Sequence, residues 1–483
     1  MTPQSSGTLA AMVQKFSGLT SDSRKVTPGF LFAAIAGTKT NGAGFVKDAV
    51  ARGAIAVLGP KEIEAEVNAT GAVFIAADNP RAALAKFAAV FYDAQPGTIA
   101  AVTGTKGKSS IVAFLREIWT HNGRKAASLG TVGVVGPNGA IPLAHTTPDP
   151  VEIHALLAQL AKDGVDHLAI EASSHGLDQH RLDGVRIRAV GFTNITRDHM
   201  DYHPTFDHYL AAKLRLFTEV VQDGGVAVIN ADAEHSEKFL AAAQARKLTV
   251  MTVGEKGQTI KLLSLESLGD YQQLKLAHGG ETYDVVLPLA GAFQASNALV
   301  AAGLAIGLGE DAAATFAALA KLKGAPGRME RVAFTANGAS VYVDYAHTPD
   351  SLEKVLEALR AHTPGRLHVV FGCGGDRDKG KRPLMGAIAA KLADDIIVTD
   401  DNPRTEDAAA IRQEILAAAP LAHEYPDRRV AIQTAVARLE AGDVLVIAGK
   451  GHETGQYIQG QVFAFSDKAE AVNAALMIGG CGA

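Results

Sequence analysis

The sequence predicts an α/β fold of three domains built on parallel sheets. Its 483 residues are about three times the ~150 residues of an average domain. Short apolar runs typical of strands alternate with helical patterns along the chain, which favours parallel sheets covered by helices. Two stretches with glycine and proline, residues 94–97 and 323–331, read as linkers. We therefore expect domains at residues 1–95, 96–332 and 333–483.

Composition and charge exclude several classes of protein. A hydrophobic fraction of 47% and a charged fraction of 20% fit a soluble globular protein. The net charge of −5 provides no basic footprint for nucleic acid or an anionic membrane. Cys373 and Cys481 lack metal-ligand spacing and form no disulfide framework, which suits a reducing cytoplasm. We expect a cytoplasmic protein without a nucleic-acid partner.

Two stretches are candidates for targeting or membrane segments. Residues 1–15 lack a basic start followed by an apolar core, so no signal peptide is expected. Residues 289–308 are the most apolar long run, but Gln294, Ser296 and Asn297 interrupt it. A buried helix therefore explains this run better than a membrane span.

The first domain reads as a small α/β unit. The apolar runs 30–35 and 54–58 are typical of strands, and residues 82–92 follow a helical pattern. The polar stretches 22–24 and 37–42 lie beside these strands and, by themselves, favour solvated turns.

A phosphate-binding loop opens the second domain, between a predicted strand at 99–102 and a predicted helix at 111–121. The loop consists of Gly104, Thr105, Lys106, Gly107, Lys108, Ser109 and Ser110. Glycines let backbone N–H groups face a phosphate, the helix N-terminus and Lys108 add positive charge, and a serine hydroxyl can bind Mg²⁺. Val102 stands where the full Walker pattern has glycine. The alternative is an ordinary strand–turn–helix connection.

Further strands are predicted at 167–170, 189–192 and 226–229, each followed by polar residues. Ligands of parallel sheets bind at the carboxyl ends of strands. Glu171, directly after the first of these strands, is the natural partner of Ser109 for Mg²⁺. A surface salt-bridge role for Glu171 is the alternative.

The stretch Arg197–His203 is dense in ionisable side chains. This density raises His199 as a candidate for a second metal or phosphate site, with a purely structural histidine as the equal alternative. Thr205 is a good N-cap for a helix over 206–220. The pattern alone predicts that Lys213, within this helix, faces solvent.

The third domain repeats the α/β pattern, with strands predicted at 341–343, 368–371, 396–398 and 444–447. Each strand ends in charged or glycine-rich residues. Such tips predict a second ligand-binding face, and we expect the central and C-terminal domains to hold substrates between them.

Taken together, the motifs resemble those of the Mur ligase family. Eight motifs occur in family order: Asp22–Arg24, Gly104–Ser110, His145–Pro148, Glu171–Gly176 with Gln179–Arg181, Thr196–His203, Asp344–Pro349, Gly374–Pro383 and Asp401–Arg404. The resemblance covers the whole chain. It implies an N-terminal uridine-binding domain, a central ATPase-like domain with a P-loop, and a C-terminal Rossmann-like domain.

The resemblance also implies an activity. Members of the family activate a carboxylate with ATP as an acyl phosphate, which an amine then converts to an amide. The motifs are most similar to members that join meso-2,6-diaminopimelate to UDP-N-acetylmuramoyl-L-alanyl-D-glutamate in peptidoglycan precursor synthesis. Small-molecule substrates, Mg²⁺, ATP and a monomeric state are implied.

Residue roles come from the resemblance alone. For ATP it implies the whole loop above, Asn297, Arg328, Asp344 and His347. For metal it implies Ser109, Glu171, His199 and Lys213, the last as N6-carboxylysine. For catalysis it implies Lys108, Lys213, His199 and Arg328, with Arg328 meeting the γ-phosphate. The family thus overrides the solvent-facing prediction for Lys213.

For the UDP-sugar dipeptide, the resemblance implies Ser21, Ser23, Thr38, Lys39, Thr40, Thr146, Thr147, Ser173, Gln179 and Arg181. For diaminopimelate it implies Arg377, Asp401, Asn402, Pro403, Arg404, Gly449 and Glu453. An arginine fork suits the extra carboxylate that distinguishes diaminopimelate from lysine. The stretch 401–404 is also compatible with a simple turn.

Two departures from the family stand in the phosphate loop. Lys106 replaces a small or neutral residue, and Ser109-Ser110 replaces the commoner threonines. Folylpolyglutamate synthetase or another Mur ligase is the competing enzyme hypothesis, and the stretch 401–404 disfavours it. An ATP-sensing module without turnover is the competing hypothesis from another class.

Overall fold

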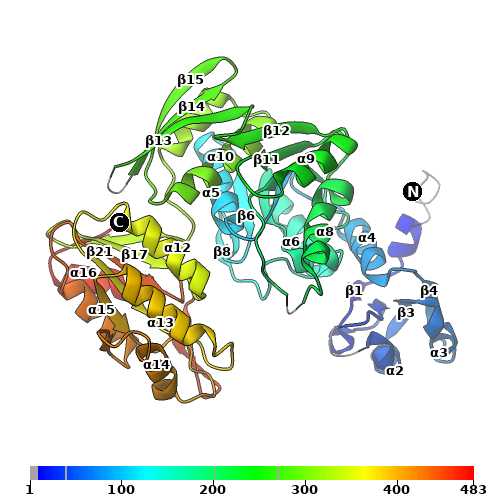
Figure 1. Cartoon of the computed structure of the whole chain (residues 1–483). Helices are drawn as coiled ribbons and strands as arrows, with labels where there is room; N and C mark the ends of the chain where they lie inside the picture. Colours follow the sequence, from blue (N-terminus) through cyan, green and yellow to red (C-terminus); the bar gives the residue numbers. More distant parts are fainter. Residues whose placement is uncertain (1–8, 38–40, 201, 269–270) are drawn as a thin grey trace. The chain divides into compact units, whose positions relative to one another are not determined.

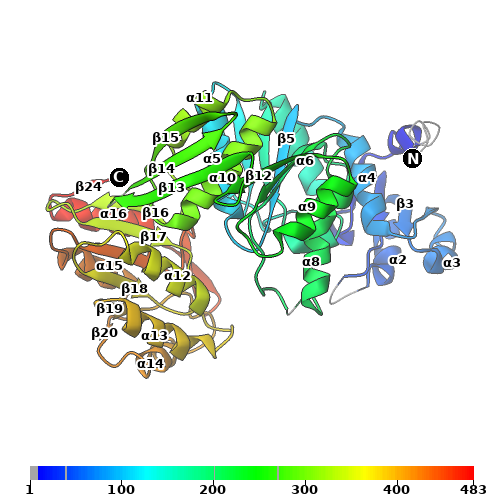
Figure 2. The ribbon, with the colours of Figure 1, turned by 45° about the horizontal axis from the view of Figure 1, so that its top comes forward.

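The computed structural model describes residues 9–37, 41–200, 202–268 and 271–483. The chain divides into two compact units. Unit 1 comprises residues 1–108, 115–253 and 303–310, and unit 2 comprises residues 109–114, 254–302 and 311–483. Figures 1 and 2 show the elements of each unit from two directions.

The N-terminal part of unit 1 is a four-stranded parallel sheet in the order β1-β2-β3-β4. Its strands are β1 (Gly18–Thr20), β2 (Phe30–Ala33), β3 (Ala54–Gly59) and β4 (Val73–Ala76), and its helices are α2 (Val46–Ala51), α3 (Glu64–Asn68) and α4 (Pro80–Tyr92). Along β2, Leu31 packs into the core that holds α4, and Phe32 into the core that holds α2 and α3. This alternation places helices on both faces, and the predicted small α/β unit is confirmed.

Eight strands of the central sheet lie in the order β12-β11-β10-β5-β9-β6-β7-β8. Pairing is parallel from β12 to β6, and β7 and β8 are antiparallel. The strands are β5 (Thr98–Thr103), β6 (Ala126–Gly130), β7 (Gly133–Gly136), β8 (Gly139–Ile141), β9 (His167–Glu171), β10 (Ile187–Phe192), β11 (Val226–Asn230) and β12 (Thr249–Gly254). All four central strands predicted from the sequence are confirmed.

Helices and a β-meander complete the central part of the chain. The helices are α5 (Lys108–His121), α6 (Pro150–Lys162), α7 (Ser174–Asp178), α8 (Phe206–Arg215), α9 (Ser236–Ala245), α10 (Ala292–Gly307) and α11 (Ala312–Leu319). The antiparallel meander is β13 (Ile260–Leu268), β14 (Tyr271–His278) and β15 (Glu281–Leu287). The apolar run 289–308 is thus mainly the predicted buried helix, α10.

The predicted helix over 206–220 begins as expected and changes form near its end. Thr205 Oγ1 accepts a hydrogen bond from the backbone N–H of His208 and caps α8. A π-helical turn, residues Leu216–Val220, continues α8. No helix among the described residues is long and apolar enough to cross a membrane.

The C-terminal sheet has the order β20-β19-β18-β21-β17-β16-β24. Its strands are β16 (Glu330–Phe334), β17 (Ser340–Asp344), β18 (Leu367–Phe371), β19 (Asp395–Val398), β20 (His423–Glu424), β21 (Val444–Ala448) and β24 (Cys481–Gly482). The four strands predicted here are confirmed. β16 begins at Glu330, so the predicted second linker already contains the start of a strand.

Helices cover both faces of this sheet (Figure 1). They are α12 (Pro349–Arg360), α13 (Lys381–Leu392), α14 (Ala408–Leu416), α15 (Arg428–Ala437) and α16 (Asp467–Met477). Tyr342 packs into the core with α12 to α14, while Val341 and Val343 pack into the core with α15 and α16. A separate hairpin, β22 (Gly455–Ile458) and β23 (Gln461–Ala464), comes after β21.

Candidate active site

The phosphate loop leaves β5 and is held by the end of neighbouring β10. The N–H groups of Thr105 and Lys106 donate to the backbone and side-chain oxygens of Asn194, at 2.8 and 3.0 Å. Gly104 has φ 151°, and a Cβ there would lie 2.0 Å from Thr193 Oγ1. Only glycine therefore fits this turn. Lys108 Nζ donates to the carbonyls of Gly104 and Thr105, both at 2.9 Å.

Glu171 is the last residue of β9, and its side chain is buried, with the residue 1% exposed. Thr131 holds the carboxylate: its N–H donates to Oε1 at 2.8 Å and its hydroxyl to Oε2 at 3.2 Å. The same hydroxyl lies 3.0 Å from that of Thr146. The surface salt-bridge alternative for Glu171 is therefore wrong.

Lys213 is buried, with 1% of its surface exposed, so the solvent-facing prediction from the pattern is wrong. It lies one helical turn after Tyr209 on the buried face of α8, and its ammonium sits 4.5 Å from the centre of the Tyr209 ring. Nζ donates to Gly104 O at 2.7 Å. Burial, with the nearby charge of Lys108, holds the pKa of Lys213 well below its usual value.

Tyr209 connects the loop, Lys213 and His199. Its hydroxyl is 2.9 Å from Thr105 Oγ1, and its ring centre lies 6.2 Å from that of His199. Burial raises the pKa of Tyr209. His199 adopts a left-handed φ of 56°, and its carbonyl accepts the N–H groups of Tyr202 and His203. This turn leaves the His199 side chain 47% exposed. The structure thus brings together three of the groups that the sequence suggested.

The residues implied for the dipeptide form a hydrogen-bonded chain that begins at Glu171. Thr147 Oγ1 donates to Glu171 O at 2.9 Å and accepts from Ser173 Oγ at 3.0 Å. Arg181 donates to Thr147 O at 2.6 Å and to Gln179 Oε1 at 2.8 Å. The candidate dipeptide residues and the candidate metal carboxylate therefore share one strand end.

The residues implied for uridine lie in the N-terminal part. Ser23 is buried, and its hydroxyl helps to lower the pKa of Asp48 by a hydrogen bond. Ser21 is exposed. Thr38, Lys39 and Thr40 lie outside the described residues.

In unit 2, the residues implied for ATP are connected to each other. Asn297 Nδ2 donates to Gln294 Oε1 at 3.1 Å, and Gln294 Nε2 donates to Arg328 O at 3.4 Å. Asp344 closes the group by accepting the N–H of Met329 at 2.6 Å. Asn297 and Asp344 are buried, which fixes the loop that carries Arg328.

Tyr345 contacts two of the residues implied for ATP, Arg328 through its ring and His347 through its backbone carbonyl. The guanidinium of Arg328 lies 4.5 Å from the ring centre of Tyr345. His347 Nδ1 lies 2.8 Å from Tyr345 O, and burial lowers the pKa of His347. Lys381 donates to His347 O at 2.8 Å.

The residues implied for diaminopimelate gather at the ends of β19 and β21. Asp401 and Asn402 are buried, and Asn402 Nδ2 donates to Glu453 Oε2 at 3.0 Å. Gly449 has φ 119°, and a Cβ there would lie 3.0 Å from Asp401 Oδ2. Burial raises the pKa of Asp401. This part of the predicted ligand face is therefore a connected cluster.

Hairpin β22–β23 pins the loop that carries Arg404. The Arg404 N–H donates to Tyr457 O at 3.0 Å, and Gln459 N–H donates to Arg404 O at 2.7 Å. Arg404 has a left-handed φ of 54°, and its Nη1 donates to Gly375 O at 2.8 Å. The buried Pro403 precedes it, and Arg377 is exposed. The turn interpretation of 401–404 is thus compatible with a binding role.

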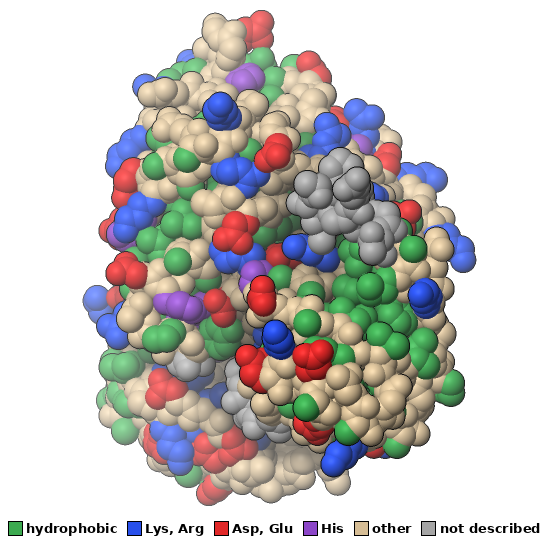
Figure 3. All heavy atoms as spheres, turned by 90° about the vertical axis from the view of Figure 1, so that its right-hand side faces the viewer, with side chains coloured by type: hydrophobic (Ala, Val, Ile, Leu, Met, Phe, Trp, Pro, Cys, Tyr) green, Lys and Arg blue, Asp and Glu red, His purple; other side chains and the backbone are tan. Residues whose placement is uncertain are grey.

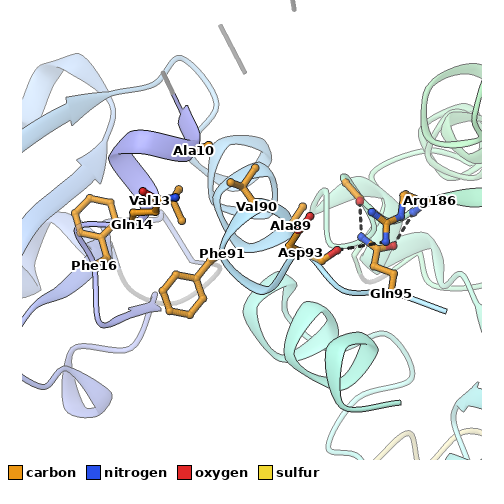
Figure 4. Close-up of a pocket in the computed structure, with 11 residues that line it drawn as sticks. Ala10, Val13, Gln14, Phe16, Ala89, Val90, Phe91, Asp93, Gln95 and Arg186 are labelled. Atoms are coloured by element: carbon orange, nitrogen blue, oxygen red, sulfur yellow. Dashed lines mark hydrogen bonds between the residues drawn. The ribbon is translucent and has the colours of Figure 1, made fainter. Parts of the chain in front are cut away.

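One cavity lies apart from the residues described above. Figure 4 shows a cavity of about 540 Å³ lined by residues such as Phe16, Val90 and Arg186, and no residue implied for a substrate lines it. Acidic and basic side chains are interspersed on the face in Figure 3. Among the described residues, no group of three or more His, Cys, Asp or Glu side chains could hold a metal.

Sequence reasoning missed three residues that shape these sites. Thr131, which holds Glu171, and Tyr209, which contacts Lys213, belong to no recognisable motif. Lys450 lies in the Gly449–Glu453 strand tip, and its glycine-flanked position was a usable signal. Its contact with Asn402 could not be predicted, because that residue is 48 positions away, whereas Glu453 and Gly455 are near it in the chain.

Comparison with known proteins gives a consistent result. Three family models match: "Mur ligase family, catalytic domain" over residues 15–92, "Mur ligase middle domain" over 102–305 and "Mur ligase, glutamate ligase domain" over 327–451. Two relatives are named "UDP-N-acetylmuramoyl-L-alanyl-D-glutamate–2,6-diaminopimelate ligase". The one from Bradyrhizobium diazoefficiens is 55% identical over 97% of this chain and 96% of its own length. The one from Agrobacterium fabrum is 54% identical over 95% and 93%.

Solved structures agree. A structure of a protein with the same name superposes with a TM-score of 0.73 at 35% identity, over 96% of this chain and 95% of that one. MurF from Acinetobacter baumannii, at 19% identity and a TM-score of 0.62 over 92% and 95%, shares the fold. On three matching models and relatives that are more than 50% identical over nearly the full length, this chain belongs to the Mur ligase family.

Proposed function

We propose that this chain is an ATP-dependent ligase that joins meso-2,6-diaminopimelate to UDP-N-acetylmuramoyl-L-alanyl-D-glutamate. The observation that carries the proposal is the grouping of the phosphate loop, Lys213 and Tyr209 around Gly104, in a chain 55% identical to a protein of that name. Three domains, at residues 1–95, 96–332 and 333–483, a cytoplasmic location and a monomeric state belong to the same proposal.

ATP binding is proposed for the loop and for the connected residues of unit 2. In the loop, backbone N–H groups and Lys108 suit the β- and γ-phosphates. The proposed set comprises Gly104, Thr105, Lys106, Gly107, Lys108, Ser109, Ser110, Asn297, Arg328, Asp344 and His347. Arg328, held against Tyr345, is proposed to meet the charge that develops on the γ-phosphate.

The oxygen donors of the site fit Mg²⁺. Glu171 supplies a carboxylate at a strand end, and Ser109 supplies a hydroxyl at the start of α5. Mg²⁺ prefers one or two carboxylates together with phosphate oxygens and water, which explains why no larger acidic cluster is needed. His199 and Lys213, as a carbamate, are proposed for a second ion. When bound, Mg²⁺ would neutralise charge on the phosphates.

The carbamate at Lys213 is supported by geometry. Carbamylation requires a neutral amine that reacts with CO₂. The Lys213 ammonium is buried beside the tyrosine ring and shares the carbonyl of Gly104 with Lys108. The positive charges of Lys108 and Lys213 repel each other at this carbonyl. A negatively charged carbamate on Lys213 would instead attract Lys108.

The proposed reaction has two steps. The free side-chain carboxylate of the D-glutamyl residue attacks the γ-phosphorus of ATP, and ADP leaves. The amine of diaminopimelate then attacks the acyl carbon, and phosphate leaves. Thr146, Thr147, Ser173, Gln179 and Arg181 would hold the dipeptide beside Glu171, and Ser21, Ser23, Thr38, Lys39 and Thr40 would hold the uridine end.

The choice of amino acid is proposed to lie with the 401–404 loop. Arg404 and Arg377 would bind the carboxylate that lysine lacks, and Asp401, Asn402, Glu453 and the carbonyl of Gly449 would accept the ammonium. When lysine covers the partly buried Arg404 without supplying a carboxylate, the unpaired guanidinium is costly, which would reject lysine. Pro403 would fix the turn.

Phosphate release tests the proposal. With ATP and the UDP-dipeptide, the rate with meso-diaminopimelate should exceed that with L-lysine at least ~100-fold. An arginine charge that a bound substrate covers and leaves unpaired costs about 2.7 kcal/mol. Arg404→Ala should lose most of this preference. Phosphate release that needs neither the UDP-dipeptide nor an amino acid would refute the ligase. Equal rates with both amino acids would refute only the specificity.

A further inference from the structure

Lys450 carries a buried charge that the proposed reaction does not use. It comes directly after Gly449 at the end of β21, and its side chain is completely buried. A buried ammonium is strongly destabilising unless several oxygen atoms surround it. The residues that surround Lys450 therefore indicate why the charge is kept.

Three oxygens accept from the Lys450 ammonium. Asn402 Oδ1 lies at 3.0 Å, Glu453 Oε2 at 3.2 Å and the carbonyl of Gly455 at 2.6 Å. Asp401 Oδ1 is further away, at 3.9 Å. An ammonium has three N–H donors, so these contacts use its full capacity.

Two of the contacted side chains also bind each other. Asn402 Nδ2 donates to Glu453 Oε2 at 3.0 Å, and Asn402 Oδ1 accepts the N–H of Tyr457 at 3.0 Å. Lys450 and Tyr457 thereby fix which end of the Asn402 amide faces Glu453. The Glu453 carboxylate is held through one oxygen, Oε2, by both Lys450 and Asn402.

We infer that Lys450 is a positioning residue for the amino-acid substrate, because it fixes the side chains of Asn402 and Glu453 at the amino-acid site. This inference rests on the proposed function. Lys450 is buried and acts through its neighbours, because its contacts and those of Asn402 both hold Oε2 of Glu453. The positive charge also offsets the repulsion between two neighbouring carboxylates, the buried one of Asp401 and that of Glu453, whose side chain is 29% exposed.

The test compares Lys450→Met and Lys450→Arg with Lys391→Met, which removes a lysine that is 71% exposed on α13 of the same unit. Phosphate release is measured with each of the three substrates varied in turn. Lys450→Met should raise KM for meso-diaminopimelate about 10- to 100-fold, the range for removing a residue that orients a ligand-binding side chain. KM for ATP and for the UDP-dipeptide should stay within about twofold.

A double-mutant cycle separates positioning from a structural role. Lys450→Met and Asn402→Ala should be strongly non-additive in KM for meso-diaminopimelate, whereas Lys391→Met and Asn402→Ala should be additive. If Lys450→Met does not fold, Lys450→Arg carries the same test, because it keeps the charge and loses the three-point geometry.

Three results would overturn the inference: an unchanged KM for the amino acid, equal rises in KM for all three substrates, or failure of both Lys450 variants to fold. The last two describe a lysine that merely supports the hairpin through Gly455. If the wild-type protein releases no phosphate in response to the amino acid, the proposed function itself would be refuted.

Discussion

Gly130→Ala tests the position of Glu171 without touching its chemistry. Gly130 ends β6, beside β9, and a Cβ there would lie 2.1 Å from Glu171 Oε1 and 2.5 Å from its Cγ and Cδ. Because carbon atoms pack at about 3.5 Å, the Glu171 side chain must move by about 1 Å. It has little room to do so, since it is buried.

The displaced carboxylate weakens its bonds to Thr131. A hydrogen bond to a charged group contributes about 1.5–3 kcal/mol, and overpacking costs about 1–3 kcal/mol. The two terms overlap, so we expect the free energy of unfolding to fall by about 2 kcal/mol and Tm to fall by about 4–8 °C. The Mg²⁺ concentration for half-maximal activity should rise about 10- to 100-fold, as when a residue that orients a metal ligand is removed.

The assay is a Mg²⁺ titration of phosphate release together with a thermal melt. Gly97→Ala is the matched control, because its nearest foreign atom, Asp166 O, lies at an ordinary 3.9 Å. The control should leave both quantities unchanged. If Gly130→Ala melts at a lower temperature and keeps the wild-type Mg²⁺ dependence, Glu171 is not a metal ligand. An unchanged melt would refute the packing argument itself.

Three further predictions concern single side chains. Lys213→Ala should be nearly inactive, and acetate or formate should partly restore its activity. The same anions should not restore the activity of Lys213→Arg. Near-normal turnover of Lys213→Ala would exclude the carbamate. Lys108→Ala should lower the rate of phosphate release about 100-fold or more, since the γ-phosphate loses a cation, and a change of a few-fold would make this lysine structural. Burial lowers the pKa of His154 in the folded protein from 6.5 to about 4. As pH falls below 6.5, the unfolded state therefore binds a proton at this histidine before the folded state does. The free energy of unfolding should fall between pH 6.5 and about pH 4. Urea unfolding should show this loss as about 3 kcal/mol, at 1.36 kcal/mol per pKa unit, and His154→Leu should remove it.

The sequence predicted strands and helices well because they depend on local patterns. β5, β9 and β11 each carry a short apolar run that ends at a polar residue, and Thr205 marks the start of α8. Glu171 could be placed at a strand end for the same reason. In each case the residues that determine the structure are neighbours in the chain.

The environment of Lys213 was not predictable in this way. Its ammonium donates to the carbonyl of Gly104, more than one hundred positions earlier in the chain, and the charged residues around it gave α8 the appearance of a solvated helix. The resemblance to a family identified it, whereas periodicity did not. The contact of Thr131 with Glu171 and that of Lys450 with Asn402 were missed for the same physical reason: these partners are 40 and 48 positions apart and meet only in the folded chain.

The hairpin that pins Arg404 has a consequence for how the substrate preference of such an enzyme can change. Both backbone groups of Arg404 are bonded to β22 and the residue after it, so main-chain contacts hold the loop at any residue that tolerates the left-handed φ of 54°. The specificity that we propose for Arg404 would thus belong to its side chain, whereas the position of the loop belongs to its main chain. A lineage could exchange one amino-acid substrate for another by replacing a few side chains of the loop 401–404, while the backbone of this loop stays unchanged.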